Sequence, residues 1–466
     1  MRIMAALLLL LPAVVPLEAR AAPAEPTWQD CRTGSGDAGA ELDAADATCT
    51  TVRVPLDPLR PDGRTIDLAV SRIKADPAKR RGVLLVNPGG PGGPGIGYPA
   101  ELKGLLGEVA AQYDLIGFDP RFTGRSAPID CGPVRLADVF RSSPTAADFQ
   151  ASSRNAARFV AGCPRDGLRH ASIRNTARDM DAIRAALGEE KISYYGVSWG
   201  ADLGVVYSQL FPSRVDRMVV DSVTDVEGSE YHHLATGEQS EAAFDEWAAW
   251  AAWRDDTYHL GRSGLQIRTA VTRVLRQRKT LAIGDYRVDS AALPWLLQSA
   301  LGDESDRDLM ARNVRTVLDA AAGRRAEPSE ELAGWLAQYY GTVPMISQFV
   351  AASVAYTCND RGWPSDLAAY RRDLRNARDT QPLFAMAFLP CAYWTQHTTE
   401  PDLAIGNNVS MLIVQAERDN IPVRWARALH QKLPNSTLKT VDRRAHGVYD
   451  ERVPSMVAAV NEYLGG

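Results

Sequence analysis

The fold of this chain is decided by residues 192–200, which read ISYYGVSWG. The first six form a short apolar run typical of a buried strand, and the residues from Trp199 onward favour a helix. Glycines two residues on either side of Ser198 permit a sharp turn where the strand and the helix crowd the backbone. Such a turn lifts the serine hydroxyl above the sheet and leaves the Trp199 N–H unpaired at the positive end of the helix. We therefore predict Ser198 as a nucleophile and Trp199 N–H as half of an oxyanion hole, the alternative being a tight turn without chemistry.

Other apolar runs predict the rest of the sheet. Short continuous runs separated by helical segments are typical of buried parallel strands in an α/β fold. An alternating pattern on either side of Pro61-Asp62-Gly63 predicts a β-hairpin between Val52 and Ile73. We expect the helix before the strand at 192–197 to begin at Thr176, with Asp179 completing a capping box. The runs are Val83–Val86, Leu115–Phe118, Ile192–Val197, Met218–Val220, Met411–Val414 and, more weakly, Thr437–Val441.

A nucleophilic serine needs a base and a group that orients the base. His446 fits the base because it follows the last expected strand, where a loop can reach the active edge of the sheet. Asp419 follows the run at 411–414 and is the preferred acid, while Glu417 and Asp221 remain possible. The order Ser198, Asp419, His446 is that of α/β-hydrolases and differs from chymotrypsin-like and subtilisin-like chains.

The loop at 87–95 reads NPGGPGGPG and directly follows an expected strand. Its glycines leave backbone N–H groups accessible to a ligand oxygen, and we predict Gly90 N–H as the second oxyanion donor. A phosphate-binding loop is the rival interpretation, but neither a G-x-G-x-x-G spacing nor a G-K-[ST] ending is present. We predict no metal and no cofactor.

Residues 224–407 show no parallel-strand pattern and are rich in helix-forming residues. We expect a large helical cap, inserted into one catalytic core made of residues 22–223 and 408–466. Within this segment Phe244, Trp247, Trp250 and Trp253 recur at three-residue steps on one drifting helix face. That face either packs the cap or forms an aromatic wall over a substrate pocket.

The N-terminus and the cysteines indicate the compartment. Residues 1–21 combine a positive charge, an apolar run of about fourteen residues and a small-x-small ending, which predicts a secretory signal peptide. The run is too short to span a bilayer. Secreted thiols tend to be paired, and pairing each cysteine with its neighbour closes loops of about twenty to thirty residues. The predicted disulfides are Cys31 with Cys49, Cys131 with Cys163, and Cys358 with Cys391.

Composition excludes several classes of function. The 466 residues are 45% hydrophobic and 23% charged, as in an ordinary globular protein. The formal net charge of −5 lacks the basic excess that binding a phosphate backbone requires, so nucleic acid is not an expected partner. Without a later apolar segment long enough to cross a bilayer, the chain is expected to leave the membrane once the signal is removed.

The motifs resemble those of secreted α/β-hydrolases of the prolyl aminopeptidase and tripeptidyl aminopeptidase group. The resemblance rests on five segments, namely 87–93 (NPGGPGG), 117–126 (GFDPRFTGRS), 196–200 (GVSWG), 417–419 (ERD) and 445–447 (AHG). It also extends to a helical cap and to Cys358-Asn359-Asp360 with a later Cys391. Two departures lie near the expected site: Phe122 stands where the family usually has glycine, and Asn420-Ile421 replace the more usual residues after the acid.

The resemblance implies cleavage of short N-terminal segments from small peptides, with the free amine held by acidic groups. Candidates for that role are Asp360, Glu227 and Glu230. Because the same triad serves any acyl transfer, an esterase, a thioesterase or a peptide-tailoring hydrolase remains the alternative enzyme. A binding module without catalysis is the non-enzymatic alternative. The oligomeric state is not predicted.

Overall fold

The computed structural model describes residues 26–33, 39–141, 145–228, 232–289, 291–396 and 403–466. The predicted signal peptide at 1–21 lies outside these residues. The central element is an eight-stranded sheet with the order β1-β2-β4-β3-β5-β6-β9-β10. The strands are β1 (Ala47–Pro55), β2 (Thr65–Ile73), β3 (Gly82–Asn87), β4 (Tyr113–Phe118), β5 (Ile192–Val197), β6 (Val215–Asp221), β9 (Met411–Ala416) and β10 (Ser436–Val441).

The predicted strands are confirmed. β1 and β2 form the antiparallel hairpin, β2 pairs antiparallel with β4, and the pairs from β4 to β10 are all parallel. Among the strands of this sheet, β2 therefore runs against the other seven. The carboxyl ends of β3, β5, β6 and β9 meet at one edge, where the loops carrying the predicted site residues begin.

Helices cover both faces of the sheet. Within β3, Leu85 belongs to one apolar cluster while Leu84 belongs to the other, and in β9 the same holds for Ile413 and Leu412. This alternation explains the continuous apolar runs, because every residue of a doubly covered strand is buried. The helices against the first face are α5 (Ile173–Ala186), α6 (Trp199–Leu210) and α16 (Val423–Lys432), and those against the second are α2 (Tyr98–Leu106) and α17 (Pro454–Gly465).

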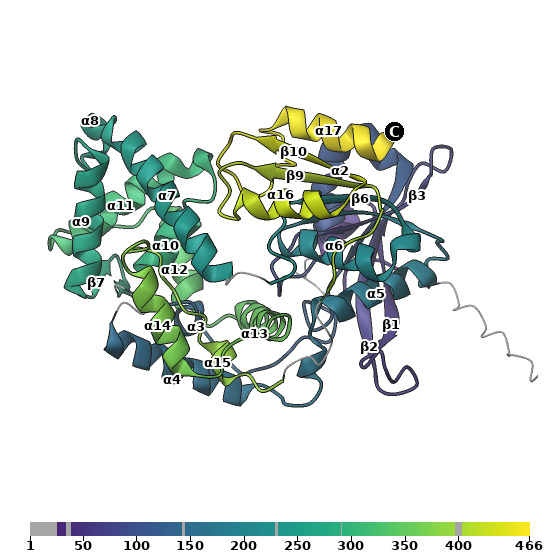
Figure 1. Cartoon of the computed structure of the whole chain (residues 1–466), viewed down its shortest axis with the longest axis horizontal. Coiled ribbons are helices and arrows are strands. Elements are labelled where there is room, and N and C mark those ends of the chain that lie inside the picture. Colours follow the sequence, from purple (N-terminus) through teal and green to yellow (C-terminus); the bar gives the residue numbers. More distant parts are fainter. Residues whose placement is uncertain (1–25, 34–38, 142–144, 229–231, 290, 397–402) are drawn as a thin grey trace, which may run out of the picture.

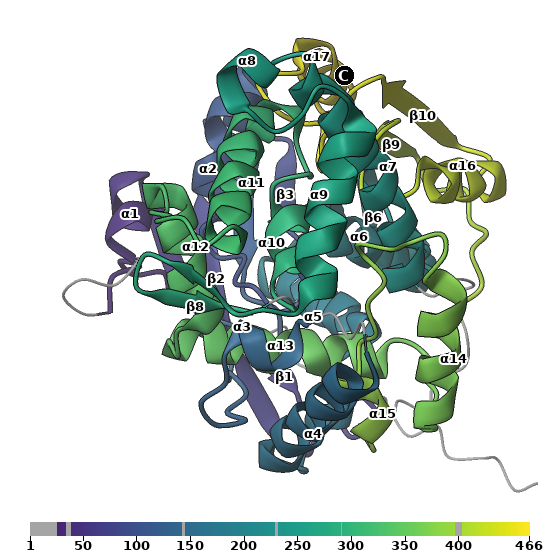
Figure 2. The same ribbon diagram turned by 90° about the vertical axis from the view of Figure 1, so that its left-hand side faces the viewer.

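In its described residues, the stretch between β6 and β9 is mostly helical, as predicted, with one short hairpin. Figure 1 shows α7, α9 and α11 grouped on the left, away from the sheet, and Figure 2 shows them in front of it. The elements are α7 (His232–Ala252), α8 (Asp255–Tyr258), α9 (Gly264–Gln277), β7 (Leu281–Ile283), β8 (Tyr286–Val288), α10 (Leu293–Ser299), α11 (Arg307–Ala321), α12 (Glu330–Tyr340), α13 (Pro344–Asn359), α14 (Leu367–Ala377) and α15 (Pro390–Tyr393).

Two helices that precede β5 in the chain join this helical group. They are α3 (Leu136–Val139) and α4 (Ala146–Gly162), which pack against α12, α13 and α15. Figure 1 shows α4 beside α15. Phe149 of α4 shares a buried cluster with Tyr370 and Leu374 of α14. The helical group is thus assembled from two separate parts of the chain.

The aromatic face of α7 packs inside this helical group. Phe244 and Trp247 are buried there with residues of α9 and α11, and Trp250 contacts Tyr258 at a ring distance of 5.8 Å. Trp253 is 88% exposed. Of the two interpretations of this face, packing is the one that fits these contacts.

The expected start of α5 is wrong by one turn. The N-cap is Ser172, whose hydroxyl accepts from Asn175 N at 3.3 Å. Thr176 lies inside the helix and contacts the Tyr356 hydroxyl at 3.0 Å. Asp179 is no capping residue either, because both of its carboxylate oxygens accept from Arg121, at 2.6 and 2.7 Å, in a fully buried ion pair. This pair ties the Asp-Pro-Arg motif to α5.

Phe122 adopts a φ of 68°, in the left-handed region where a glycine is unstrained. This conformation gives a physical reason for the glycine usual at that position. Its side chain is buried with Val350 and Val354 of α13, so packing accompanies the strained backbone.

The three predicted disulfides are formed. Cys31 bonds to Cys49 beside β1, Cys131 to Cys163 around α3 and α4, and Cys358 to Cys391 between α13 and α15. Two of the three therefore lie in the helical group. None of the helices in the described ranges is both long and apolar enough to cross a lipid bilayer.

Candidate active site

Ser198 occupies the turn between β5 and α6. Its φ of 58° and ψ of −127° are strained for a side-chain-bearing residue, and its N–H donates to Asp221 O at 2.8 Å. The flanking glycines are required by close packing, since a Cβ on Gly196 would lie 2.3 Å from the Gly200 carbonyl oxygen. As the residue before α6, Ser198 leaves the Trp199 N–H at the first helical position, without a partner inside the helix.

His446 and Asp419 lie together at the same edge of the sheet. His446 Nδ1 is 3.0 Å from Asp419 Oδ1, and because a carboxylate only accepts, the imidazole donates from Nδ1. This tautomer leaves Nε2 as the acceptor. Asp419 is buried and also accepts from Ile421 N at 3.0 Å and from Gln415 Nε2 at 2.8 Å. The carboxylate is thereby fixed in position.

Burial lowers the pKa of His446, but the charge and hydrogen bond of Asp419, with the charge of Asp221, outweigh it and raise that pKa above its ordinary value. The raised pKa means that the imidazole takes up a proton more readily than a free histidine does. A base that accepts the proton of a serine hydroxyl needs this property.

The alternative acids occupy other positions. Asp221 accepts from Val448 N and Tyr449 N at 2.8 and 2.9 Å, so it holds the backbone of the loop that follows His446. Glu417 forms an ion pair with Arg427 at 2.6 Å. Of the three acids considered, Asp419 is the one hydrogen-bonded to the histidine.

The glycine-rich loop after β3 adjoins the nucleophile. A Cβ on Gly89 would lie 3.0 Å from Ser198 Cβ and 3.4 Å from Trp199 N. Gly90 lines the same cavity as Ser198 and has a φ of 125°. The loop also touches α13, because a Cβ on Gly92 would lie 2.6 Å from Ser353 N.

A cavity of about 640 Å³ opens over these residues. Ser198, Trp199, Gly90 and His446 line it from the sheet edge. Aromatic rings line it from the helical group, with Phe140 stacked on Trp295 at 4.9 Å and tilted against Phe388 at 5.7 Å. The cavity is also lined by Trp363, Arg141, Asn420 and Ile421. The two residues at 420–421 that differ from the usual family sequence therefore face the cavity.

Two carboxyl groups complete the cavity wall, that of Asp202, which is buried, and that of Asp360, which is half-buried. Asp360 was expected, and Asp202 was not. Burial raises the pKa of Asp360 to about 7, against the opposing effects of the Ile173 N–H, Arg361 and the Trp199 side chain. Burial likewise raises the pKa of Asp202 to about 6, against hydrogen bonds from Thr224.

The remaining acidic candidates lie elsewhere. Glu227 forms an ion pair with Lys432 and does not line the cavity. Glu230 lies outside the described residues. A sequence signal for Asp202 existed, because it follows Ser198 by four residues at the start of a helix and so shares its face.

A serine on a strained strand-to-helix turn, with a hydrogen-bonded histidine and aspartate on later loops of a mostly parallel sheet, defines the α/β-hydrolase class. Comparison with known families agrees. The alpha/beta hydrolase fold family matches residues 82–265, and the family described as TAP-like protein matches residues 374–465.

Individual relatives indicate which kind of α/β-hydrolase this chain is. The tripeptidyl aminopeptidase of Streptomyces lividans is 34% identical over 96% of this chain and 85% of its own length. The serine protease Hip1 of Mycobacterium tuberculosis is 33% identical over 48% of this chain and 44% of its own. Among solved structures, the proline iminopeptidase of Mycobacterium smegmatis aligns at 15% identity with a TM-score of 0.39, covering 89% and 97% of the two chains. The chain belongs to the tripeptidyl aminopeptidase family of α/β-hydrolases and is a serine peptidase.

Proposed function

We propose that this protein is an exported serine aminopeptidase, which releases a short N-terminal segment, such as a tripeptide or a proline residue, from small peptides. The observation that carries the proposal is one cavity lined by Ser198, His446 and the half-buried carboxyl group of Asp360. A nucleophile and an anion facing one space suit a substrate with a carbonyl to attack and an amine to hold.

In the proposed reaction, His446 Nε2 takes the proton of Ser198 while the serine oxygen attacks the peptide carbonyl carbon. Asp419 stabilises the resulting imidazolium, and the N–H groups of Trp199 and Gly90 hold the oxyanion. The imidazolium then protonates the leaving amine, which departs and leaves the N-terminal segment esterified to Ser198. Water, deprotonated by the same histidine, attacks this acyl-enzyme and releases the segment with a new carboxyl group.

Recognition of the N-terminus falls to Asp360, with Asp202 as a second carboxyl group in the same wall. Above the pKa of Asp360, an ammonium group entering the cavity meets a carboxylate that is partly shielded from water, which favours a charge-assisted hydrogen bond. The aromatic rings of Phe140, Trp295 and Phe388 offer an apolar surface to the side chains of the segment. The cavity therefore suits a short, uncharged N-terminal segment with a free amine.

Export and domain organisation complete the proposal. Three disulfides fit an oxidising compartment outside the cytosol, in agreement with a signal peptide at 1–21. We assign the catalytic core to residues 22–223 and 408–466 and the cap to 224–407, with α3 and α4 joining the cap by packing. The core supports the chemistry, and the cap closes the cavity above it.

Replacing the nucleophile tests the assignment. Ser198→Ala is expected to lower kcat on trialanine p-nitroanilide by about 10⁴- to 10⁶-fold, because no other group can form the acyl-enzyme. The matched control is Ser213→Ala, at an exposed serine in the short helix Pro212–Arg214, with an expected rate within twofold of the unmodified protein. Retention of full activity by Ser198→Ala would exclude this serine as the nucleophile.

The esterase alternative needs a separate substrate panel. The same protein is assayed with p-nitrophenyl esters of acetate and butyrate, with alanine, dialanine, trialanine and proline p-nitroanilides, and with their N-acetylated forms. The proposal predicts the highest kcat/KM on an unblocked anilide, and the preferred segment length follows from the ranking. A preference for the esters over every anilide would favour the esterase.

A further inference from the structure

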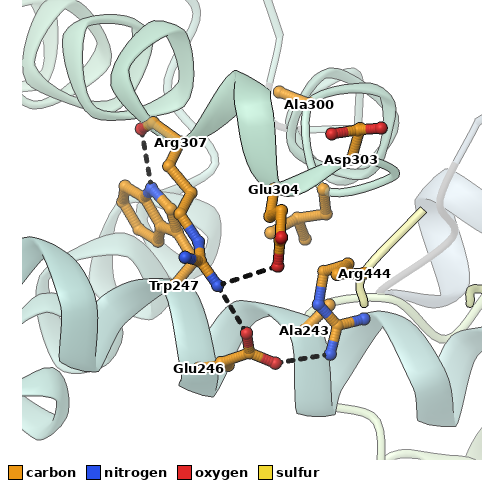
Figure 3. Close-up of a pocket in the computed structure, with 9 residues that line it drawn as sticks. Ala243, Glu246, Trp247, Ala300, Asp303, Glu304, Arg307 and Arg444 are labelled. Atoms are coloured by element: carbon orange, nitrogen blue, oxygen red, sulfur yellow. Dashed lines mark hydrogen bonds and ion pairs between the residues drawn. The ribbon is translucent and has the colours of Figure 1, made fainter. Parts of the chain in front are cut away.

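A cluster of charged side chains joins the cap to the loops that carry His446 and Asp419. At its centre is Glu246 on α7, with its two carboxylate oxygens bound to different partners. Glu246 Oε2 accepts from Arg444 Nη2 at 2.8 Å, and Oε1 accepts from Arg307 Nη2 at 2.6 Å and from Arg418. Figure 3 shows Glu246 between Arg444 on one side and Arg307 on the other.

Two of these arginines belong to the catalytic loops. Arg418 directly precedes Asp419, and Arg444 stands two residues before His446. The two loops are also joined to each other, because Arg444 Nη1 donates to the Arg418 carbonyl oxygen at 2.8 Å. Glu246 therefore binds one side chain from each of the loops that position the acid and the base.

A second contact comes from the short helix at Glu304–Asp306. Glu304 N donates to the Arg444 carbonyl oxygen at 3.1 Å, and its carboxylate lies 3.3 Å from Arg418 Nη2. The cap thus meets the histidine loop through backbone as well as side-chain atoms. Arg307, which is on the cap itself, links Glu246 and Glu304 at 2.6 and 3.7 Å.

The charges of the cluster are largely shielded from water. Arg444 is buried, and the side chains of Glu246, Arg307 and Arg418 are 29%, 26% and 33% exposed. Burial alone would raise the pKa of Glu246, but the hydrogen bond and charge of Arg444, with the charges of Arg418 and Arg307, lower it below its ordinary value. The carboxylate stays ionised wherever the peptidase reaction is assayed near neutral pH.

We propose that Glu246 is a positioning residue of the peptidase, which aligns the His446–Asp419 pair by binding both loops from the cap. Contact between the cap and these loops then fixes the arrangement of His446 and Asp419, and the cap also encloses the substrate. The inference rests on the proposed roles of His446 and Asp419. It makes the cap part of the catalytic step, whereas a cap that only binds substrate would affect binding alone.

The test compares a small ester with a peptide. In Glu246→Gln, the neutral amide cannot hold three arginines, and kcat is expected to fall about 10- to 100-fold on both p-nitrophenyl acetate and trialanine p-nitroanilide, with KM within twofold. Equal losses on both substrates indicate misalignment of the shared base. Glu246→Asp keeps the charge on a shorter side chain, and its kcat is expected to fall less than that of Glu246→Gln. If the glutamine variant does not fold, the kcat of the aspartate variant tests the positioning role.

The matched control is Asp245→Asn, on the same helix. Asp245 is 65% exposed and forms its ion pair with Arg268 inside the cap, at 2.6 Å, so its loss is expected to leave kcat within twofold. Unchanged kcat in the Glu246 variants would overturn the proposal, as would a higher peptide KM with ester hydrolysis unaffected. Since Ser198→Ala tests the catalytic serine separately, either result would overturn the positioning role while leaving the peptidase assignment intact.

Discussion

The sheet edge and the cap build the same cavity in different ways. At the sheet edge, each proposed catalytic side chain lies within a few residues of a strand end, so its place in the fold follows from the order of strands along the chain. In the cap, the cavity wall combines residues from α3, α10, α13 and the segment before α15, brought together by packing, two disulfides and long-range hydrogen bonds. The difference suggests that chemistry can be retained in this fold while the cap changes the substrate.

The largest effect that separates the two regions is expected at the sheet edge. Asp419→Asn should lower kcat by about 10³- to 10⁴-fold on esters and peptides alike, because the imidazole loses its orientation and its stabilising charge. The sign of the pH effect follows from the same contact. Since Asp419 raises the pKa of His446, its removal lowers that pKa, and the acid limb of the remaining activity should move to lower pH.

Measurement of kcat/KM from pH 5 to 9 checks this prediction. The exposed Asp442→Asn, which breaks only an ion pair with Arg418 on the solvent side, serves as a nearby control for loss of a carboxylate. An acid limb at the same or higher pH in Asp419→Asn would show that this carboxylate does not set the pKa of the histidine.

A smaller effect, confined to substrates with a free amine, is expected in the cap. Asp360→Asn should raise KM for trialanine p-nitroanilide by about 10- to 100-fold, because the amide keeps the shape but loses the charge paired with the ammonium. Hydrolysis of p-nitrophenyl acetate should change less than twofold. Glu227→Gln, which alters the candidate that lies outside the cavity, is the control, and an equal effect in both variants would contradict the role of Asp360.

The smallest effect concerns pH. With the pKa of Asp360 raised to about 7, the carboxyl group becomes protonated and loses its charge as the pH falls below that value. KM calculated for the ammonium form of the free peptide should therefore rise about tenfold from pH 8 to pH 6, while KM for p-nitrophenyl acetate stays nearly constant. Parallel profiles for the two substrates would indicate that no carboxyl group near this pKa binds the amine.

Sequence-based prediction gave the correct placement where a residue depends on its neighbours in the chain. The strands follow from short apolar runs, and glycine spacing and position after a strand place Ser198, Asp419 and His446 at one edge of the sheet. The catalytic roles of these three residues stay predictions. Prediction failed where partners are distant. Glu246, for example, binds Arg418 across 172 residues. No local pattern records such contacts.

The start of α5 shows the same limit on a smaller scale. Thr176 followed by Asp179 satisfies a capping pattern, yet Ser172 caps the helix one turn earlier. Asp179 instead forms an ion pair with Arg121, a residue 58 positions away, because a buried guanidinium requires a carboxylate partner. Tertiary pairing has overridden a local preference.

One ratio tests the central claim most directly, namely that the sheet edge supplies serine chemistry while the cap selects a free N-terminus. It is the ratio of kcat/KM for trialanine p-nitroanilide to kcat/KM for its N-acetylated form, measured on the unmodified protein at pH 7.5. The account predicts a preference of about 10²-fold or more for the free amine, because acetylation leaves the half-buried Asp360 carboxylate without its partner. Equal values for the two substrates would contradict it.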